Sequence, residues 1–408
     1  MEVFVARQPI FDAADQLQAY ELLYRRSGDA VRAEGATQRQ MSHEVLLHSL
    51  LGFGLDRVTG GKTAFINFTR EMLTERLYEL LDRGTVMIEL LEGVEPDEEA
   101  VAACRELTRA GYRLALDDFV PREAAEPFLE CAEVVKLDVL NASADELART
   151  VERLRPFGVR LLAERVETRE VRDLCLELGF ELFQGYYFSR PEILSRREIS
   201  VEQAGAIRLM NLLRDPDATD GDIEEAFRTD PLLTYKLLRI VNSASVGGRG
   251  IQSIGHAVRM VGRETLHRWL ALLFVTSIPA ETGVESERVH AAVQRARLCE
   301  LVGEAGGRGK STGAYFMVGI FSMLDVLLRV PLEELLARID LAPEVRDALL
   351  RGEGPYAPSL EMVRAYEAGR WDEVARLAAA AGVSALDVPD LYVQSLTWAR
   401  ERMRALGE

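Results

Sequence analysis

Cysteine is scarce in this sequence, which contains four cysteines among 408 residues. The cysteines are far apart and form no CxxC pair, and no histidine stands near them at the spacing of a metal ligand. This pattern is typical of buried thiols in a protein of a reduced compartment. The four residues are Cys104, Cys131, Cys175 and Cys299.

Long apolar runs are also missing. The chain begins MEVFVARQPIFD, without the basic region and the apolar stretch of a signal peptide. The best candidate for a membrane span, Ala314–Val330, contains Asp325 and is better explained as a buried core helix. We therefore expect a cytoplasmic protein that does not act at a membrane.

Basic residues are outnumbered by acidic ones, 49 Lys and Arg against 66 Asp and Glu, and the formal net charge is −17. Such a charge repels nucleic acid and anionic lipid head groups, so direct nucleic-acid binding is not expected. A small anionic ligand remains compatible with it, because bound cations or a few Lys and Arg side chains can hold a phosphate.

The first half of the chain shows short β-rich runs that alternate with helical periodicity. This alternation predicts parallel strands joined by crossover helices, here a (β/α)8 barrel of the TIM type over residues 1–195. Only the polar turn FDAADQ separates the first two strands, so we expect them to form an antiparallel hairpin. The expected strands are Val3–Gln8, Leu17–Tyr24, Thr63–Phe68, Thr85–Leu90, Tyr112–Asp117, Val134–Asp138, Arg160–Glu164 and Glu181–Gln184.

Helices are expected between these strands from the second strand onward. Four of them are clear from their periodicity, and Gly179 gives the last one a C-cap signal. They are Met41–Gly52, Asp97–Ala110, Ala144–Arg155 and Arg169–Leu178.

The second half, residues 196–408, reads as successive amphipathic helices without a convincing alternating β segment, and predicts an all-α domain. A chain of this length can bury two cores of roughly 200 residues each. We place the boundary between the two domains near residue 195. Helix breaks are expected at Asp215–Thr219, Gly247–Gly250, Gly306–Gly309, Gly352–Ala357 and Pro389.

Polar side chains stand at the ends of the expected barrel strands. These ends form the mouth at which the active sites of β/α barrels lie. A buried carboxylate without a partner is costly, so several acids at one mouth require positive charge. The residues are Glu21, Asn67, Glu89, Asp117, Asp118, Lys136, Glu164 and Gln184.

Divalent metal is the simplest source of that charge. Carboxylate and amide oxygens suit Mg²⁺, Mn²⁺ or Ca²⁺, and the pair Asp117–Asp118 could flank two ions. Lys136 would form a salt bridge or orient an attacking water. Each residue alone also has an ordinary structural explanation, such as a helix N-cap. Their succession around the mouth favours a site for metal and a phosphodiester.

The first 195 residues resemble an EAL domain, the barrel that hydrolyses cyclic di-GMP to the linear dinucleotide. The matching segments are RQPIFD, AYELLYR, FINF, VMIELLE, LALDDF, VVKLD, LLAERVET and FQGYYFSRP. The resemblance implies metal-assisted in-line attack of water on one phosphodiester, with two ions, Mg²⁺ or Mn²⁺, that stabilise the attacking and leaving oxygens.

The resemblance also implies a role for each residue. Lys136 would orient the water, and Glu164 would act as metal ligand or general base. Arg25 would contact a phosphate, while Glu167 and Gln184 would complete the pocket. The implied metal ligands are Glu21, Asn67, Glu89, Asp117 and Asp118.

The sequence departs from the EAL pattern at three places. The signature triplet reads Glu21-Leu22-Leu23, and Leu91 replaces the threonine of the family's ExTE motif. The loop after Asp118 reads FVPREAAEP where the family has a Gly-Ser-rich loop that couples dimerisation to metal and substrate binding. These departures favour binding over turnover.

In the helical half, His256, His267 and His290 form no HD pair and no i, i+4 pair, so a histidine-metal hydrolase centre is not expected. The segment DPLLTYKLLRIVNSASVGGRGIQSIGHAVRMVGRETLHRWL resembles an HDOD domain, a helical relative of HD phosphohydrolases that has lost their catalytic residues. Where those enzymes carry His-Asp, this chain has Ser322-Met323. The helical half is therefore predicted to be a non-catalytic interaction or output module.

Together the two domains resemble the YuxH-like group of bacterial signalling proteins. The leading hypothesis is a protein whose barrel binds cyclic di-GMP or a related phosphodiester with divalent metal, and whose helical domain relays this state to a protein partner. One alternative is an active cyclic di-GMP phosphodiesterase, and another is a scaffold that binds no nucleotide. Whether two copies pair as a homodimer stays open.

Overall fold

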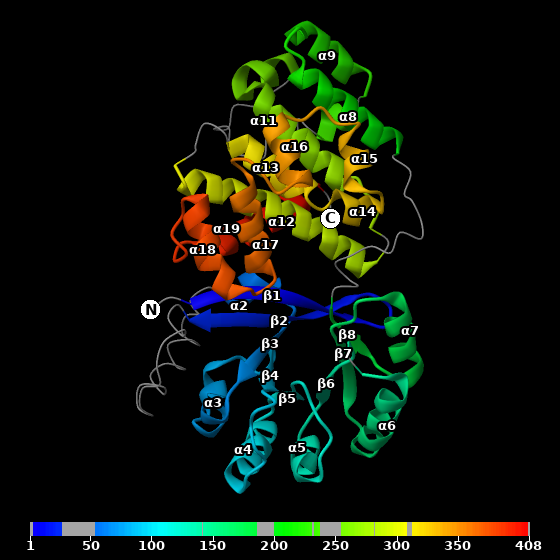
Figure 1. Cartoon of the computed structure of the whole chain (residues 1–408), viewed down its shortest axis with the longest axis vertical. Coiled ribbons are helices and arrows are strands. Elements are labelled where there is room, and N and C mark those ends of the chain that lie inside the picture. The colour runs from blue at the N-terminus through cyan, green and yellow to red at the C-terminus, as the bar shows by residue number, and fades with distance from the viewer. Residues whose placement is uncertain are drawn as a thin grey trace. The chain divides into compact units, whose positions relative to one another are not determined.

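A computed structural model divides the chain into two compact units, shown in Figure 1. One unit contains Met1–Glu192 with Thr282–Val284, and the other contains Ile193–Glu281 and Glu285–Glu408. The structure describes residues 3–26, 54–140, 142–185, 200–230, 232–236, 254–280, 282–307 and 312–406. The boundary expected near residue 195 falls outside the described residues.

Eight strands close into a barrel in the order of the sequence (Figure 1). The first strand pairs antiparallel with the second and the eighth, and all other neighbours are parallel. This confirms the expected barrel with an antiparallel first strand. The strands are β1 (Val3–Asp12), β2 (Leu17–Arg26), β3 (Thr63–Phe68), β4 (Val86–Leu90), β5 (Arg113–Leu116), β6 (Val134–Asp138), β7 (Arg160–Glu164) and β8 (Leu182–Phe183).

The β1–β2 hairpin is longer than the sequence suggested. Its pairing runs from Val3 opposite Arg26 to Phe11 opposite Leu17. At the turn, Asp12 Oδ1 accepts hydrogen bonds from the amides of Ala14 and Gln16, at 2.8 and 2.9 Å. A short polar side chain that satisfies nearby amides in this way stabilises a tight turn.

The helices around the barrel begin and end within two residues of the expected bounds where both are described. Three of these helices begin at a residue whose side chain accepts a hydrogen bond from a backbone amide, namely Asp97, Ser143 and Thr168. The last of them ends at Gly179, which has a left-handed φ of 95°. The expected helix Met41–Gly52 lies outside the described residues. The helices are α2 (Leu55–Thr59), α3 (Arg70–Thr74), α4 (Glu98–Arg109), α5 (Glu126–Leu129), α6 (Ala144–Leu154) and α7 (Arg169–Leu178).

The barrel interior is filled by one apolar side chain from each strand. We call these residues the inner apolar cluster, and each of them is almost completely buried. A filled interior makes the barrel a packed core rather than a pore. The cluster consists of Ile10, Ala19, Phe65, Met87, Ala115, Val134, Leu162 and Leu182.

All regular elements among the described residues of the second unit are helices, as expected. Its longest helices are α11, which is interrupted at Gly262 (φ 79°), and α12. The helices are α8 (Val201–Arg214), α9 (Asp220–Arg228), α11 (Ile254–Thr276), α12 (Gly283–Ala305), α13 (Thr312–Phe321), α14 (Leu324–Leu328), α15 (Leu332–Leu336), α16 (Pro343–Leu350), α17 (Ala357–Glu367), α18 (Trp371–Ala381) and α19 (Val388–Leu406).

The expected helix breaks at Asp215–Thr219 and Gly352–Ala357 separate helices in the structure. The break at Gly247–Gly250 lies outside the described residues, as does part of Gly306–Gly309. The break expected at Pro389 lies just before it, since α18 ends at Ala381 and α19 begins at Val388, and proline is tolerated in the first turn of a helix.

The apolar run Ala314–Val330 lies in α13 and α14, and most of its side chains are buried. Among the described residues, no helix is both long and apolar enough to cross a membrane. The cysteine thiols are free, and all are buried except that of Cys131, which is half-buried against our expectation.

Candidate functional site

The polar residues of the barrel mouth follow the inner apolar cluster by two positions along each strand. Ala19 is followed by Glu21, for example, and Val134 by Lys136. Because alternate side chains of a strand point to the same face, the residue two positions beyond a cluster member also points into the barrel. The same step leads to Asn67, Glu89, Asp117, Glu164 and Gln184, and in the antiparallel strand β1 it leads from Ile10 to Gln8.

Lys136 lies at the centre of this polar group, with its side chain 1% exposed. Its Nζ lies 2.7 Å from Glu164 Oε1, 3.0 Å from Asp117 Oδ1 and 3.2 Å from Glu21 Oε2. A fourth contact joins Lys136 Nζ to Glu89 Oε1, and the Glu89 side chain is completely buried. One ammonium group therefore bridges carboxylates from four different strand ends.

Gln184 extends the group toward β1. Its Nε2 donates to Glu21 Oε2 and to Gln8 Oε1, both at 2.8 Å. Gln8 stands directly opposite Glu21 in the β1–β2 register. The sequence reasoning missed Gln8, although an antiparallel hairpin with Glu21 facing inward places an inward-facing residue beside it.

The adjacent acids Asp117 and Asp118 differ in exposure and in backbone conformation. The Asp117 amide donates to Leu90 O at 3.0 Å, which holds its side chain at the end of β5 beside Lys136. Asp118 takes a left-handed φ of 41° and is exposed. Positive φ is uncommon for a residue other than glycine, and such strain often marks functional sites. The two carboxylates are thus adjacent in sequence but differently placed.

Burial changes the protonation of this group. It raises the pKa of Glu89 well above its ordinary value, and it raises the pKa of Glu164 to about 8. The pKa of the Asp118 carboxyl is also raised, because the group is partly desolvated although its residue is exposed at the surface, and because the charge of Asp117 lies nearby. Burial alone would lower the pKa of the Lys136 ammonium, but the surrounding carboxylates together raise this pKa well above its ordinary value. Lys136 is therefore charged, and it is the positive charge that the acids share.

The side-chain oxygens of this polar group are chemically suited to bind a divalent metal ion. The side chains offer hard oxygen ligands, and Glu89 Oε2 is buried without a hydrogen-bond partner among the described residues. In the described part of the chain, no three Asp, Glu, His or Cys side chains already surround a common point as metal ligands. Their oxygens are turned toward Lys136 instead, so the binding of an ion requires these side chains to reorient.

Not all the predicted site residues join this group. Asn67 stands beside Glu89 in the β3–β4 register, whereas Glu167 is exposed in the loop after β7. Arg25 lies in β2, but its side chain is outside the described residues. Gly185 has φ 145°, and a Cβ there would collide with the backbone of Val166. Glycine therefore allows the segment after β8 to pack against the loop after β7.

The departures from the EAL pattern can be placed as well. Leu22 follows Glu21 in β2, is fully buried and points to the opposite face of the strand, away from the polar group. Leu91 follows β4 and is half-buried. In the loop after Asp118, Pro121 O accepts from Arg153 at 3.3 Å and Arg122 pairs with Glu95 at 3.4 Å. The first departure thus leaves the polar group unaltered, and the loop is tied to neighbouring elements.

At the position of the HD pair in the helical unit, Ser322 is part of a structural network. Its hydroxyl donates to Gly319 O at 2.7 Å and accepts from Arg295 Nη1 at 3.1 Å. Arg295 also donates from Nε and from Nη2 to Glu367 Oε2, at 2.9 and 2.6 Å. A neutral hydroxyl and a satisfied ion pair are unsuited to holding a catalytic metal.

Two family models match the chain. The model described as the EAL domain matches residues 61–191, and the model described as the HDOD domain matches residues 203–334. The EAL match covers the polar residues from Asn67 to Gln184 and begins after Glu21 and Arg25.

Two relatives cover almost the whole chain. YuxH of Bacillus subtilis, described as an uncharacterized protein, is 31% identical over 412 residues, which are 99% of this chain and 100% of YuxH. CdgJ of Vibrio cholerae, named as a cyclic di-GMP phosphodiesterase, is 31% identical over 406 residues, which are 99% of this chain and 94% of CdgJ.

Similar solved structures align with 47% of the chain. The EAL enzyme Bd1971 with bound cAMP and cyclic di-GMP is 18% identical, with a TM-score of 0.38 and 62% of its chain covered. BlrP1 of Klebsiella pneumoniae in complex with calcium and cyclic di-GMP is 23% identical, with a TM-score of 0.38 and 56% of its chain covered.

Proposed function

Because this chain belongs to the family of EAL–HDOD proteins that includes YuxH and CdgJ, we propose that its barrel binds cyclic di-GMP with divalent metal and that its helical domain relays this state to a protein partner. The observation that carries the proposal is the contact of Lys136 with four carboxylates at the barrel mouth. The mouth is the part of a β/α barrel at which ligands bind.

Charge explains why metal belongs to this proposal. In the metal-free protein the raised pKa values of Glu89 and Glu164 keep part of this charge neutral, but once both carboxyls are ionised the four carboxylates leave three negative charges that Lys136 does not compensate. A phosphodiester would add further negative charge and would be repelled. Mg²⁺ or Mn²⁺ at the acids would reverse the local field and attract the phosphate oxygens.

Each residue then has a proposed role. Lys136 orients a water molecule, and Glu164 serves as metal ligand or general base. Arg25 contacts a phosphate, Gln184 positions Glu21, and Glu167 reaches the ligand from the loop after β7. The proposed metal ligands are Glu21, Asn67, Glu89, Asp117 and Asp118.

Hydrolysis of cyclic di-GMP is the second candidate function. Lys136 and Glu164 are in contact at 2.7 Å, which suits a pair that places and deprotonates a water. Leu22 points away from the polar group, so the altered triplet does not itself disable the site. CdgJ, which matches the chain along its whole length, is named as a phosphodiesterase.

Two measurements separate binding from hydrolysis. Calorimetry with cyclic di-GMP and Ca²⁺ measures binding, and we expect heat that disappears in Glu21→Ala. Incubation with cyclic di-GMP and Mg²⁺ or Mn²⁺ then tests for the linear dinucleotide. Product made by the parent protein and not by Glu21→Ala would establish the enzyme. Absence of both heat and a thermal shift would contradict ligand binding and favour the scaffold hypothesis.

The wider proposal concerns organisation and location. We assign the barrel domain to residues 1–195 and the relay domain to residues 196–408, in a cytoplasmic protein. Capture of partners by the full chain, with and without cyclic di-GMP and Mn²⁺, tests the relay. A partner retained equally in both conditions would contradict it. Sedimentation under the same two conditions measures whether two copies pair.

A further inference from the structure

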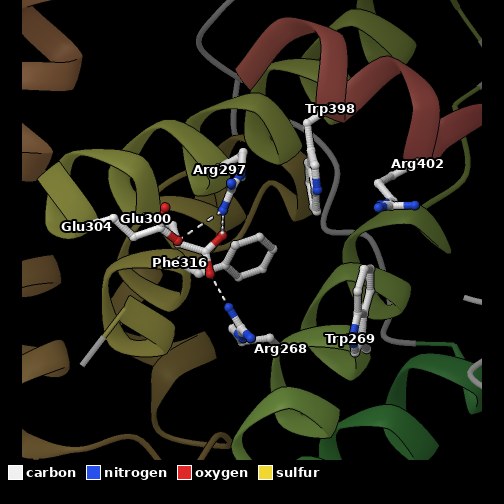
Figure 2. A pocket seen from close by; sticks show the side chains of 8 residues that line it. All are labelled: Arg268, Trp269, Arg297, Glu300, Glu304, Phe316, Trp398 and Arg402. Carbon is white, nitrogen blue, oxygen red and sulfur yellow. Dashed lines mark hydrogen bonds and ion pairs between the residues drawn. The ribbon is translucent and has the colours of Figure 1, made fainter. Parts of the chain in front are cut away.

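The helical unit contains a cavity of about 200 Å³ that none of the barrel chemistry uses. Figure 2 shows the side chains that line it, which come from α11, α12, α13 and α19. All four helices belong to the same compact unit, apart from the first turn of α12. The cavity is therefore a feature of this unit alone.

Aromatic rings form one part of the cavity wall. The indoles of Trp269 in α11 and Trp398 in α19 lie nearly parallel, with an interplanar angle of 25° and centroids 6.3 Å apart. Phe316 in α13 meets Trp398 edge-on, with centroids 6.1 Å apart. Such faces are suited to packing against another flat ring.

The acidic side chains of the cavity are already paired. Glu300 is 3% exposed, and each of its carboxylate oxygens accepts from a different arginine. Arg297 donates to Glu300 Oε2 at 2.5 Å, and Arg268 donates to Glu300 Oε1 (Figure 2). Glu304, at 43% exposure, lies 3.4 Å from Arg297. These acids compensate Arg268 and Arg297.

Arg402 differs from the other two arginines. Its guanidinium lies 5.6 Å from the Trp269 ring centroid and 5.5 Å from that of Trp398, but it pairs with no carboxylate among the described residues. Its Nε is buried and has no hydrogen-bond acceptor there. The Nε of Arg268, on the other side of the cavity, is buried and unsatisfied in the same way. Two buried N–H donors without acceptors thus belong to side chains that line one cavity.

We propose that this cavity binds a small anion built on a planar aromatic ring, with its carboxylate or phosphate on Arg402 and its ring against Trp269 and Trp398. An anionic oxygen at the guanidinium of Arg402 would form charge-assisted hydrogen bonds and would balance a charge that has no carboxylate partner among the described residues. Stacking on two indoles already holds Arg402 in place, so little side-chain freedom is lost when the anion binds.

The volume limits the size of this ligand. An apolar cavity of about 150 Å³ is known to accept benzene. The present cavity of about 200 Å³ is partly open to solvent, so it can enclose a flat ring and an anionic group while a linking sugar stays at its opening, and it is too small for a dinucleotide. A nucleoside monophosphate and a simple aromatic carboxylate share this chemistry, and the test distinguishes them. The inference does not rest on the proposed ligand of the barrel.

Tryptophan fluorescence of the full-length protein gives a direct test, because two of its three tryptophans line the cavity. One titration series uses benzoate, benzamide and acetate, and the other uses AMP, adenosine and inorganic phosphate. We expect benzoate or AMP to change the fluorescence at submillimolar to millimolar concentration. In each series the neutral ring (benzamide or adenosine) and the anion without a ring (acetate or phosphate) should bind at least about tenfold more weakly. The first lacks the charge that contacts Arg402, and the second lacks the ring that packs on the indoles.

Substitutions locate the binding. Arg402→Gln and Arg402→Met should weaken it about 10- to 100-fold, since they remove a charge-assisted contact. Arg404→Gln, an exposed arginine in the same helix, is the matched control and should leave affinity unchanged. Trp371→Phe, outside the cavity, should keep the fluorescence response. Thermal melts show which variants fold, and Arg402→Met preserves the most packing.

Three results would overturn the proposal. One is the absence of any response to both benzoate and AMP at millimolar concentration. Another is equal binding of the neutral or the ringless analogue. The third is unchanged affinity in whichever Arg402 variant folds.

Discussion

Lys136 Nζ lies 2.7 Å from Glu164 Oε1, although the two residues belong to different strands of the barrel. In the β6–β7 register Lys136 stands beside Leu162, two residues before Glu164. The lysine therefore starts deeper in the barrel and extends its side chain up to the level of the carboxylates. A shorter side chain at this position would leave the acids without their shared cation.

Replacing Lys136 by methionine should destabilise the metal-free protein. The change keeps a long apolar side chain but leaves carboxylates buried without a counter-charge. Removal of one partner from a buried charge network costs about 3–5 kcal/mol. Urea denaturation at neutral pH in the presence of a chelator measures the effect. Lys62→Met alters an exposed lysine and should change stability by less than about 0.5 kcal/mol. Equal stability of the two variants would argue against the central role of Lys136.

Replacing Glu89 by glutamine should have opposite effects without and with metal. Glu89 is completely buried, and burial raises the pKa of its carboxyl, so a neutral amide should stabilise the metal-free protein. In the parent protein, Mn²⁺ at 100 times its dissociation constant should stabilise the fold by about 2.7 kcal/mol, and the variant should lose most of this gain. Melting temperatures with a chelator and with Mn²⁺ measure both effects. The exposed Glu98→Gln is the control, and a full metal response in Glu89→Gln would remove Glu89 from the ligands.

Replacing Gly185 by alanine should damage the barrel mouth. The added Cβ would meet the backbone of Val166, and φ 145° is a conformation that side chains other than glycine rarely adopt. We expect a loss of about 3 kcal/mol or more, with weaker cyclic di-GMP binding. Gly61→Ala is the matched control, because Gly61 also has positive φ (82°) but nothing lies within 4 Å of a Cβ there. The control should lose only about 1 kcal/mol. Chemical denaturation and calorimetry compare the two variants, and similar losses would show that the collision is relieved.

His267 should make the stability of the helical unit depend on pH. The side chain is 7% exposed, and burial lowers its pKa to about 4 from the model-compound value of 6.5. Between these values the unfolded chain binds a proton that the folded chain does not, so stability rises with pH. The contribution is complete above pH 6.5 and falls by about 3 kcal/mol as the pH is lowered toward 4. Denaturation of the parent and of His267→Leu across this range tests the prediction. The slope should be smaller in His267→Leu and unchanged in His290→Gln, which alters a half-exposed histidine.

The sequence predicted the barrel well because its signals are local. Each strand is a short apolar run, and caps such as Ser143 and Gly179 mark helix ends through contacts within a few residues. The sequence was less successful where pairing partners decide the length of a strand. β1 and β2 are longer than expected because they pair with each other along the whole hairpin. β8 is shorter than expected and contains only the two residues that pair with β1.

Most residues of the candidate site could be predicted from the sequence, but the arrangement of their side chains could not. The acids, Lys136 and Gln184 could be named from their places at the strand ends. Gln8 was missed because its role depends on the antiparallel register that sets it opposite Glu21. The left-handed φ of 41° at the exposed Asp118, directly after the half-buried Asp117, is a backbone feature that no residue pattern specified.

The sequence by itself determined the fold classes of the two halves and the presence of acids around one lysine. The reason is that hydrophobic periodicity and the position of a residue within a strand can be read directly from the order of residues. Only the tertiary structure decided which of these groups touch Lys136, and only it brought the guanidinium of Arg402 to 5.6 and 5.5 Å from the ring centroids of Trp269 and Trp398. The physical reason is that charge interactions and stacking depend on distances between segments far apart in sequence. Those distances are set by closure of the barrel and by packing of the helices.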